Sequence, residues 1–220
     1  MSSDRPRDAR SPEVDEAATS GFEPRLATLI RSRGSALLGA LERHLPGSRE
    51  HADGTAAYAF AAAVELGGER DDAEAVREAA RLHEVGMVYV PAKVLAKPSR
   101  KLTREERALI ESRFASAAEL ARGAGIPARA CEWIGAAGER FDGGGPAGLA
   151  GERIPIESRI VRVACASDTI LAAPAPAGAS PRERQQAALD ELRHAAGTEL
   201  DPRVIAALAA LLERAATPGV

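Results

Sequence analysis

Alanine makes up about a fifth of this chain, while aromatic residues account for only 3%. Alanine has the highest intrinsic helix propensity of all residues, whereas sheets favour β-branched and aromatic side chains. With 45% hydrophobic residues, the chain can still bury a substantial core. That core must be built mainly from Ala, Leu, Val and Ile, which favours closely packed helices. We therefore predict an all-α domain.

Charge and hydropathy exclude several classes of partner. The 220 residues carry a formal net charge of −3, so no overall positive field would attract a nucleic acid polymer or an anionic membrane surface. The longest apolar stretch, residues 56–66, is about half the length of a membrane span, and the N-terminus lacks the apolar run of a signal peptide. The two cysteines, Cys131 and Cys165, provide no disulfide framework. These features predict a cytoplasmic protein without nucleic acid or membrane partners.

Apolar spacing, capping residues and helix breakers divide the chain into segments. Residues 1–21 are rich in Ser, Pro and charge, so we expect a disordered leader before a domain at 22–216. Prolines prevent a long helix in 85–102, and a Gly-rich loop is expected at 138–155. The predicted helices cover residues 22–45, 49–66, 71–84, 103–122, 127–137 and 156–171, and two more begin at Ser180-Pro181 and Asp201-Pro202.

The four histidines are the first candidates for chemistry. His44 and His194 lie among charged residues near predicted helix ends, where a capping or solvated role is expected. His51 opens the second predicted helix, and His83 ends the third beside Glu84. On these residues alone, a cluster of charges at helix ends is the simpler interpretation, and a binding site is the alternative.

Several short motifs follow this pair in a fixed order. His83-Glu84 precedes Val-Gly-Met, Val-Pro, Lys-Pro and Leu-Thr pairs, and a downstream Glu-Arg-Phe-Asp run precedes a Gly-rich segment, Gly-Leu, Ile-Pro and Arg-Ile. Across about residues 35–214, their order and spacing resemble the HD-GYP family of metal-dependent cyclic di-GMP phosphodiesterases. The resemblance implies an HD-type helical bundle with one Gly-rich loop.

The resemblance also implies which positions would bind metal. The family's first metal site corresponds to His51, His83, Glu84 and Cys165. Its further metal ligands correspond to Arg113, Ala137 and Gly138. Alanine and glycine offer no side-chain ligand, and a permanently charged guanidinium repels a cation. The resemblance therefore implies a degenerate site with no catalytic residue and at most one metal ion.

Two interpretations of the first metal site remain open. Two imidazoles, a carboxylate and a thiolate are suitable ligands for one tetrahedral zinc ion. Alternatively, no cofactor is bound, Cys165 is a small buried residue, and Arg113 pairs with Glu84 to fill the former site. We expect the second arrangement, with a single zinc ion as the alternative.

Three further residues are candidate ligand or phosphate contacts. The exposed edge of Arg113 could receive a phosphate group, and Arg140 and Asp142 flank the Gly-rich turn. The simplest expectation for Arg140 is a pair with a nearby acid. The family's later Arg-rich phosphate clamp is replaced by residues 172–178, which contain no basic residue. Trp133 is expected in the core.

These residues lead to two functional hypotheses. The first is a degenerate HD-GYP-like signalling domain without catalysis, which binds a cyclic dinucleotide or a signalling protein partner. The alternative is a metal-dependent phosphohydrolase with a reduced, mononuclear site. Missing ligands at three positions favour the first hypothesis.

Overall fold

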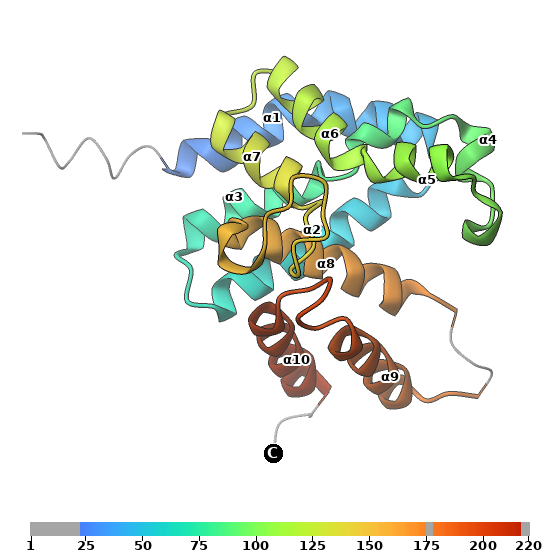
Figure 1. Ribbon diagram of the computed structural model, residues 1–220. Helices are drawn as coiled ribbons and strands as arrows, with labels where there is room; N and C mark the ends of the chain where they lie inside the picture. The colour runs from blue at the N-terminus through green and yellow to red at the C-terminus, as the bar shows by residue number, and fades with distance from the viewer. Residues whose placement is uncertain (1–22, 175–177, 217–220) are drawn as a thin grey trace, which may run out of the picture.

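The computed structural model describes residues 23–174 and 178–216 (Figure 1), so the predicted leader at 1–21 lies outside the described residues. No strand occurs in the described residues, apart from an isolated bridge between Ala196 and Leu200, and the all-α prediction is confirmed. The longer helices are α1 (Glu23–His44), α2 (Ser48–Glu65), α3 (Arg70–Arg81), α5 (Arg104–Glu111), α6 (Arg113–Gly123), α7 (Ala128–Ala136), α8 (Ile156–Ala172), α9 (Pro181–His194) and α10 (Pro202–Ala216). Shorter elements are η2 (Val85–Tyr89), α4 (Ala92–Leu95), η3 (Ser99–Lys101) and η4 (Gly151–Arg153).

Local capping chemistry sets two helix starts where the sequence predicts them. At α5, Thr103 Oγ1 accepts a hydrogen bond from the Glu106 amide, and the Glu106 carboxylate accepts one from the Thr103 amide. Ser180 and Glu183 form the same reciprocal pair at the start of α9. Each pair satisfies amides that lack a partner within the helix.

The structure differs from the predicted helices at two points that shape the site. The helix expected at 103–122 is divided into α5 and α6 at Ser112, whose hydroxyl bonds back to the Leu109 carbonyl. Helix α3 ends at Arg81, where the amide of His83 bonds the Ala80 carbonyl three residues back. His83 and Glu84 therefore lie in the turn between α3 and η2.

Closely packed alanines bring the central helices together. Helix α2 packs on both α3 and α8, and α1 packs on α3. The buried face of α2 carries Ala52, Ala56 and Ala59, each at most 3% exposed. Such small side chains let helix backbones approach closely. Figure 1 shows α1, α6 and α7 on one side of this centre and α9 and α10 on the other.

Glycine permits one further close approach. A Cβ atom at Gly86 in η2 would collide with the backbone of α6 at Arg113 and Ala117. The absence of that atom lets η2 and α6 pack against each other. This contact places the start of α6 directly beside the His83-Glu84 turn. Within residues 23–174 and 178–216, no helix is both long and apolar enough to span a membrane.

Candidate metal and ligand site

The structure brings together the four residues that the sequence assigns to the first metal site. His51 comes from α2, His83 and Glu84 from the turn after α3, and Cys165 from α8. One ligand atom from each residue lies within 4.8 Å of those of the others. We call these four residues the cluster.

His51 is oriented by a residue that the sequence analysis missed. Its Nδ1 lies 2.7 Å from Oδ2 of Asp168 on α8. Because the carboxylate accepts this hydrogen bond, Nδ1 donates it and Nε2 faces the cluster. Asp168 follows Cys165 by three residues on one helix, and that helical spacing is the signal that could have found it. Gly54 makes room for this carboxylate, since a Cβ atom there would collide with it.

His83 is fully buried and presents an unpartnered nitrogen. Its Nδ1 lies 2.6 Å from the Ala80 carbonyl oxygen, which can only accept, so Nδ1 carries the proton. Nε2 is buried and has no hydrogen-bond partner among the described residues. Burial lowers the pKa of His83 to about 4, so at neutral pH Nε2 is a free lone pair. A buried lone pair of this kind suits a metal ligand.

The two carboxylate oxygens of Glu84 contact different residues. Arg113 Nε donates to Oε1 at 2.9 Å, while Oε2 lies 3.7 Å from His51 Nε2. Burial by itself raises the pKa of Glu84, but His83, Arg113 and His51 together hold it below its ordinary value. The predicted Arg113–Glu84 ion pair is confirmed.

Two contacts of His51 Nε2 have the spacing expected around a small tetrahedral ion, while the ligand atoms of the whole cluster lie within 4.8 Å of one another. Cys165 Sγ lies 3.7 Å from His51 Nε2, the same distance as the Glu84 contact. By geometry, a tetrahedral zinc ion with ordinary bond lengths separates its ligand atoms by about 3.3–3.8 Å. Burial raises the pKa of the Cys165 thiol to about 12, so without a metal it is a neutral thiol. The cluster is thus able to hold one zinc ion through His51, His83, Glu84 and Cys165.

The positions that correspond to further metal ligands hold other groups. Ala137 is fully buried after the end of α7. At Gly138, a Cβ atom would lie only 3.0 Å from the Phe114 ring. The Arg113 guanidinium stacks 4.2 Å from the centre of that ring and also donates to the Ile110 carbonyl. Guanidinium and phenyl groups therefore lie where further ligands would have to approach.

Arg140 and Asp142 are occupied within the Gly-rich loop. Arg140 donates to both Asp142 oxygens, at 3.1 and 2.7 Å, and to Glu199 at 2.8 Å, so the expected pairing with a nearby acid is confirmed. The Arg140 side chain holds the pKa of Asp142 at about 2. Buried Glu139 also stabilises the loop, because its carboxylate accepts hydrogen bonds from the amides of Ala147 and Leu149. Arg140 and Asp142 thus stabilise the loop, and the structure does not bring them into the cluster.

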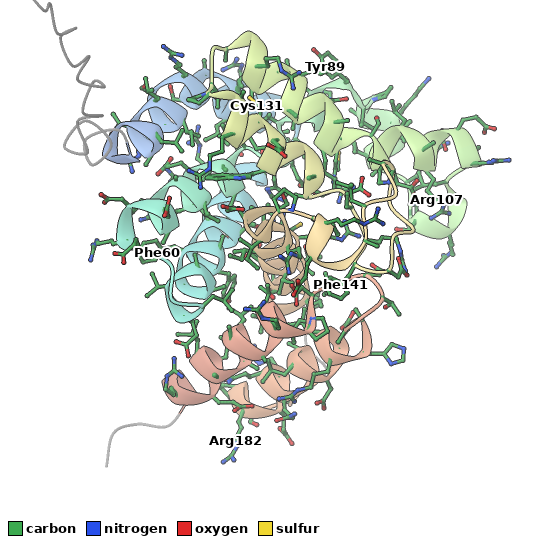
Figure 2. All side chains as sticks on the ribbon, turned by 60° about the vertical axis from the view of Figure 1, so that its left-hand side comes forward. Phe60, Tyr89, Arg107, Cys131, Phe141 and Arg182 are labelled. Carbon is green, nitrogen blue, oxygen red and sulfur yellow. The ribbon has the colours of Figure 1, made fainter. Side chains whose placement is uncertain are left out.

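The loop is attached to the C-terminal part of the chain. The amides of Phe141 and Asp142 donate to the carbonyls of Glu199 and Thr198, in the connection between α9 and α10. Figure 2 shows Phe141 between the helices of the central layer and those C-terminal helices. The loop therefore connects two parts of the bundle.

A cavity of about 440 Å³ opens beside the cluster, between α6, α8 and α9. Cys165 belongs to both the cluster and the cavity wall, and Arg113, which pairs with Glu84 of the cluster, lines the cavity as well. Arg162 also lines it, and the sequence analysis did not single this residue out. We call it the α6–α8–α9 cavity.

The remaining candidates lie apart from the cluster. His44 Nε2 is 2.8 Å from the Val90 carbonyl, and His194 is exposed at the end of α9 on the rim of the cavity. Trp133 is buried in the core, as expected. Cys131 lies on α7, on the side of the molecule opposite α9 (Figure 2), and its thiol bonds the Ile126 carbonyl.

The comparisons identify the family. The sequence model of the HD domain family matches residues 27–204, so this chain belongs to the HD domain family. The cyclic di-GMP phosphodiesterase response regulator RpfG of Xanthomonas campestris is 36% identical over 152 residues. The match covers 66% of this chain but only 38% of that protein. The chain therefore spans well under half the length of this curated relative.

Solved structures share the fold. Bd1817, an HD-GYP-type protein from Bdellovibrio bacteriovorus, superposes with a TM-score of 0.61 at 18% identity, covering 90% of this chain and 63% of that one. The PgpH HD domain of L. monocytogenes, solved in complex with cyclic di-AMP, gives 0.59 at 17% identity, covering 84% and 99%. The HD-type helical bundle expected from the motifs is thus confirmed.

Proposed function

We propose that this domain is a signalling module that binds a cyclic dinucleotide without hydrolysing it. The relatives support this class of ligand, because RpfG is named for cyclic di-GMP and the PgpH domain was solved with cyclic di-AMP. The observation that most strongly supports the loss of hydrolysis is the Arg113–Glu84 ion pair.

The ion pair opposes a second metal ion for an electrostatic reason. In metal-dependent phosphodiester hydrolysis, adjacent metals activate water and hold the phosphate together. Here the fixed positive charge of Arg113 lies against the one carboxylate of the cluster. A second cation would have to approach that charge without a side-chain ligand from Ala137 or Gly138. The arrangement therefore supports one metal ion at most.

A single ion in the cluster would also have a closed coordination shell. Structural zinc sites use four protein ligands, whereas catalytic sites keep one position open for water or substrate. The cluster supplies four ligands in all. These are two imidazoles, one carboxylate and one thiol, which becomes a thiolate when it binds metal. When bound, such an ion would hold α2, the α3–η2 turn and α8 together.

The experiment measures binding and turnover on the same preparation. The purified chain is incubated with cyclic di-GMP and Mn²⁺, Fe²⁺ or Zn²⁺, products are separated by chromatography, and binding is measured by calorimetry. We expect saturable binding, with no linear dinucleotide or GMP above a boiled control. Product that is lost in His83→Ala but kept in His44→Ala, a histidine outside the cluster, would contradict the proposal.

A second function is favoured by one observation, the unpartnered Nε2 of His83. If one of the other three ligands stays off the metal, a mononuclear site with an open position could hydrolyse a phosphoester. In that case a panel of phosphomonoesters and phosphodiesters should show turnover that requires one equivalent of metal and His83. Metal content without turnover on any of them would exclude this function.

A further inference from the structure

We infer that Arg113 and Arg162 form a metal-independent phosphate site in the α6–α8–α9 cavity. The two side chains come from different walls, Arg113 from α6 and Arg162 from α8. The inference deepens the proposed function, on which it rests for the cyclic dinucleotide as ligand. Its core claim, that guanidinium groups hold a phosphate without metal, can be tested separately.

The contacts of Arg162 are those of a guanidinium that lacks good partners. Its side chain is only 21% exposed, and its Nε is buried with no hydrogen-bond partner among the described residues. Nη1 lies 3.4 Å from the Ala137 carbonyl, and Nη2 lies 3.8 Å from a Glu199 oxygen. Hydrogen bonds from N–H groups are normally about 2.7–3.2 Å long. The fork of donors is therefore oriented by the protein but not saturated by it.

Arg113 contributes a second, fixed guanidinium. Its Nε and Nη1 donate to Glu84 and to the Ile110 carbonyl, and its plane stacks on Phe114. Nη2 has no hydrogen-bond partner in the part of the chain that the structure describes. The ion pair with Glu84 thus holds the group still, which reduces the entropy lost when Nη2 binds an oxygen.

Among the cations near the cavity, Arg162 has the weakest pairing with a negative charge. Glu84 is bound by Arg113, and Glu199 is bound more closely by Arg140, at 2.8 Å, than by Arg162. Glu191 and His194 line the cavity from α9 and are exposed. A phosphate would supply the negative charge that Arg162 lacks.

The rest of the wall indicates what the phosphate is attached to. It is mostly apolar, with Phe114, Ala166, Ile170, Leu192, Ala195 and Leu200. A volume of about 440 Å³ lies within the usual range of small-molecule sites, about 300–1,000 Å³. Two donors for phosphate oxygens next to an apolar surface suit a nucleotide, whose base is flat and whose phosphate is charged.

The test compares three variants, two at Arg162 and a control at Arg203, by calorimetry with cyclic di-GMP and with GMP as probes. Arg162→Gln should weaken binding about 10- to 100-fold, because hydrogen bonds from a charged donor are lost. Arg162→Lys, which keeps the charge but not the fork, should lose less. Arg203→Gln removes the same charge from an exposed side chain that lies 4.0 Å from Glu152, and this variant should bind like the parent chain. Thermal melts establish that each variant is folded.

One further measurement, with added metal, and the pattern of binding of the two probes decide whether the inference and the proposed function stand. Added Mn²⁺ or Zn²⁺ should change the affinity less than about threefold if guanidinium groups hold the phosphate; binding that requires added metal overturns the inference. If cyclic di-GMP binds equally to the Arg162→Gln variant, the inference fails while the proposed function stands. If GMP binds through Arg162 but no cyclic dinucleotide binds, the inference stands and the proposed function fails. If neither probe binds, both are overturned.

Discussion

Arg113→Ala should lower the free energy of unfolding by about 3 kcal/mol, because it leaves the Glu84 carboxylate without its cation. The two side chains are only 20% and 16% exposed, and their hydrogen bond is 2.9 Å long. A charge-assisted hydrogen bond of this kind contributes about 1.5–3 kcal/mol. The bond to the Ile110 carbonyl and the stacking on Phe114 are lost as well, for about 1 kcal/mol more. Uptake of a proton by Glu84 limits the total.

The assay is thermal and urea unfolding of metal-free protein. For a domain of this size, about 3 kcal/mol corresponds to a fall in melting temperature of about 6–12 °C. The double variant Arg113→Ala with Glu84→Ala should recover part of that loss, since no buried charge remains unpaired. Arg193→Ala, which breaks an exposed ion pair with Glu213, should cost less than about 1 kcal/mol.

One result would refute this reasoning. If Arg113→Ala melts like the parent chain, and the double variant is no more stable than Glu84→Ala alone, then the guanidinium does not neutralise Glu84. The positive charge of Arg113 would then no longer explain why a second metal ion is excluded.

Three further predictions concern the zinc ligands and the loop. Competition with a coloured zinc chelator should show at most one zinc ion per chain, and two equivalents of metal would contradict the assignment. The Cys165→Ser variant should bind zinc at least about tenfold more weakly, because a hydroxyl is a far poorer ligand than a thiolate. Asp168→Asn should weaken zinc about 10- to 100-fold in the same assay, because it loosens His51, and unchanged affinity would exclude this orienting role. Glu139→Ala should lower the free energy of unfolding in urea by about 3 kcal/mol, because two loop amides lose a charged acceptor. It should also speed proteolysis within residues 142–153. Cleavage of the loop no faster than in the parent chain would refute this role of Glu139.

The sequence predicts those features that depend on neighbouring residues. The starts of α5 and α9 follow from Thr103 and Ser180, whose capping partners lie three residues away. The end of α3 is placed three residues too late, because the turn at His83 depends on the packing of η2 against α6. That contact involves residues about 30 positions apart, and helical periodicity carries no information about it.

In the candidate site, too, the sequence predicts what neighbouring residues determine but not what tertiary contacts determine. The motif register identifies the four residues of the cluster, but it does not identify Asp168 or Arg162. Both lie three residues from Cys165 on α8, so helical spacing places them on its face. Their roles depend on His51, Ala137 and Glu199, which come from other helices and loops. Only the fold reveals which polar atoms find partners and which do not.

The geometry of Glu84 changes how the two interpretations of the cluster relate to each other. From the sequence alone, a zinc site and an Arg113–Glu84 ion pair are alternatives. In the structure the ion pair uses Oε1, while Oε2 faces His51 Nε2 at the spacing of a zinc ligand pair. One carboxylate can therefore serve Arg113 and a zinc ion together. Metal content and catalysis are then separate properties, because a zinc ion with four protein ligands has no open position for water. Finding one equivalent of zinc would thus be no evidence of hydrolysis, and turnover has to be measured independently of it.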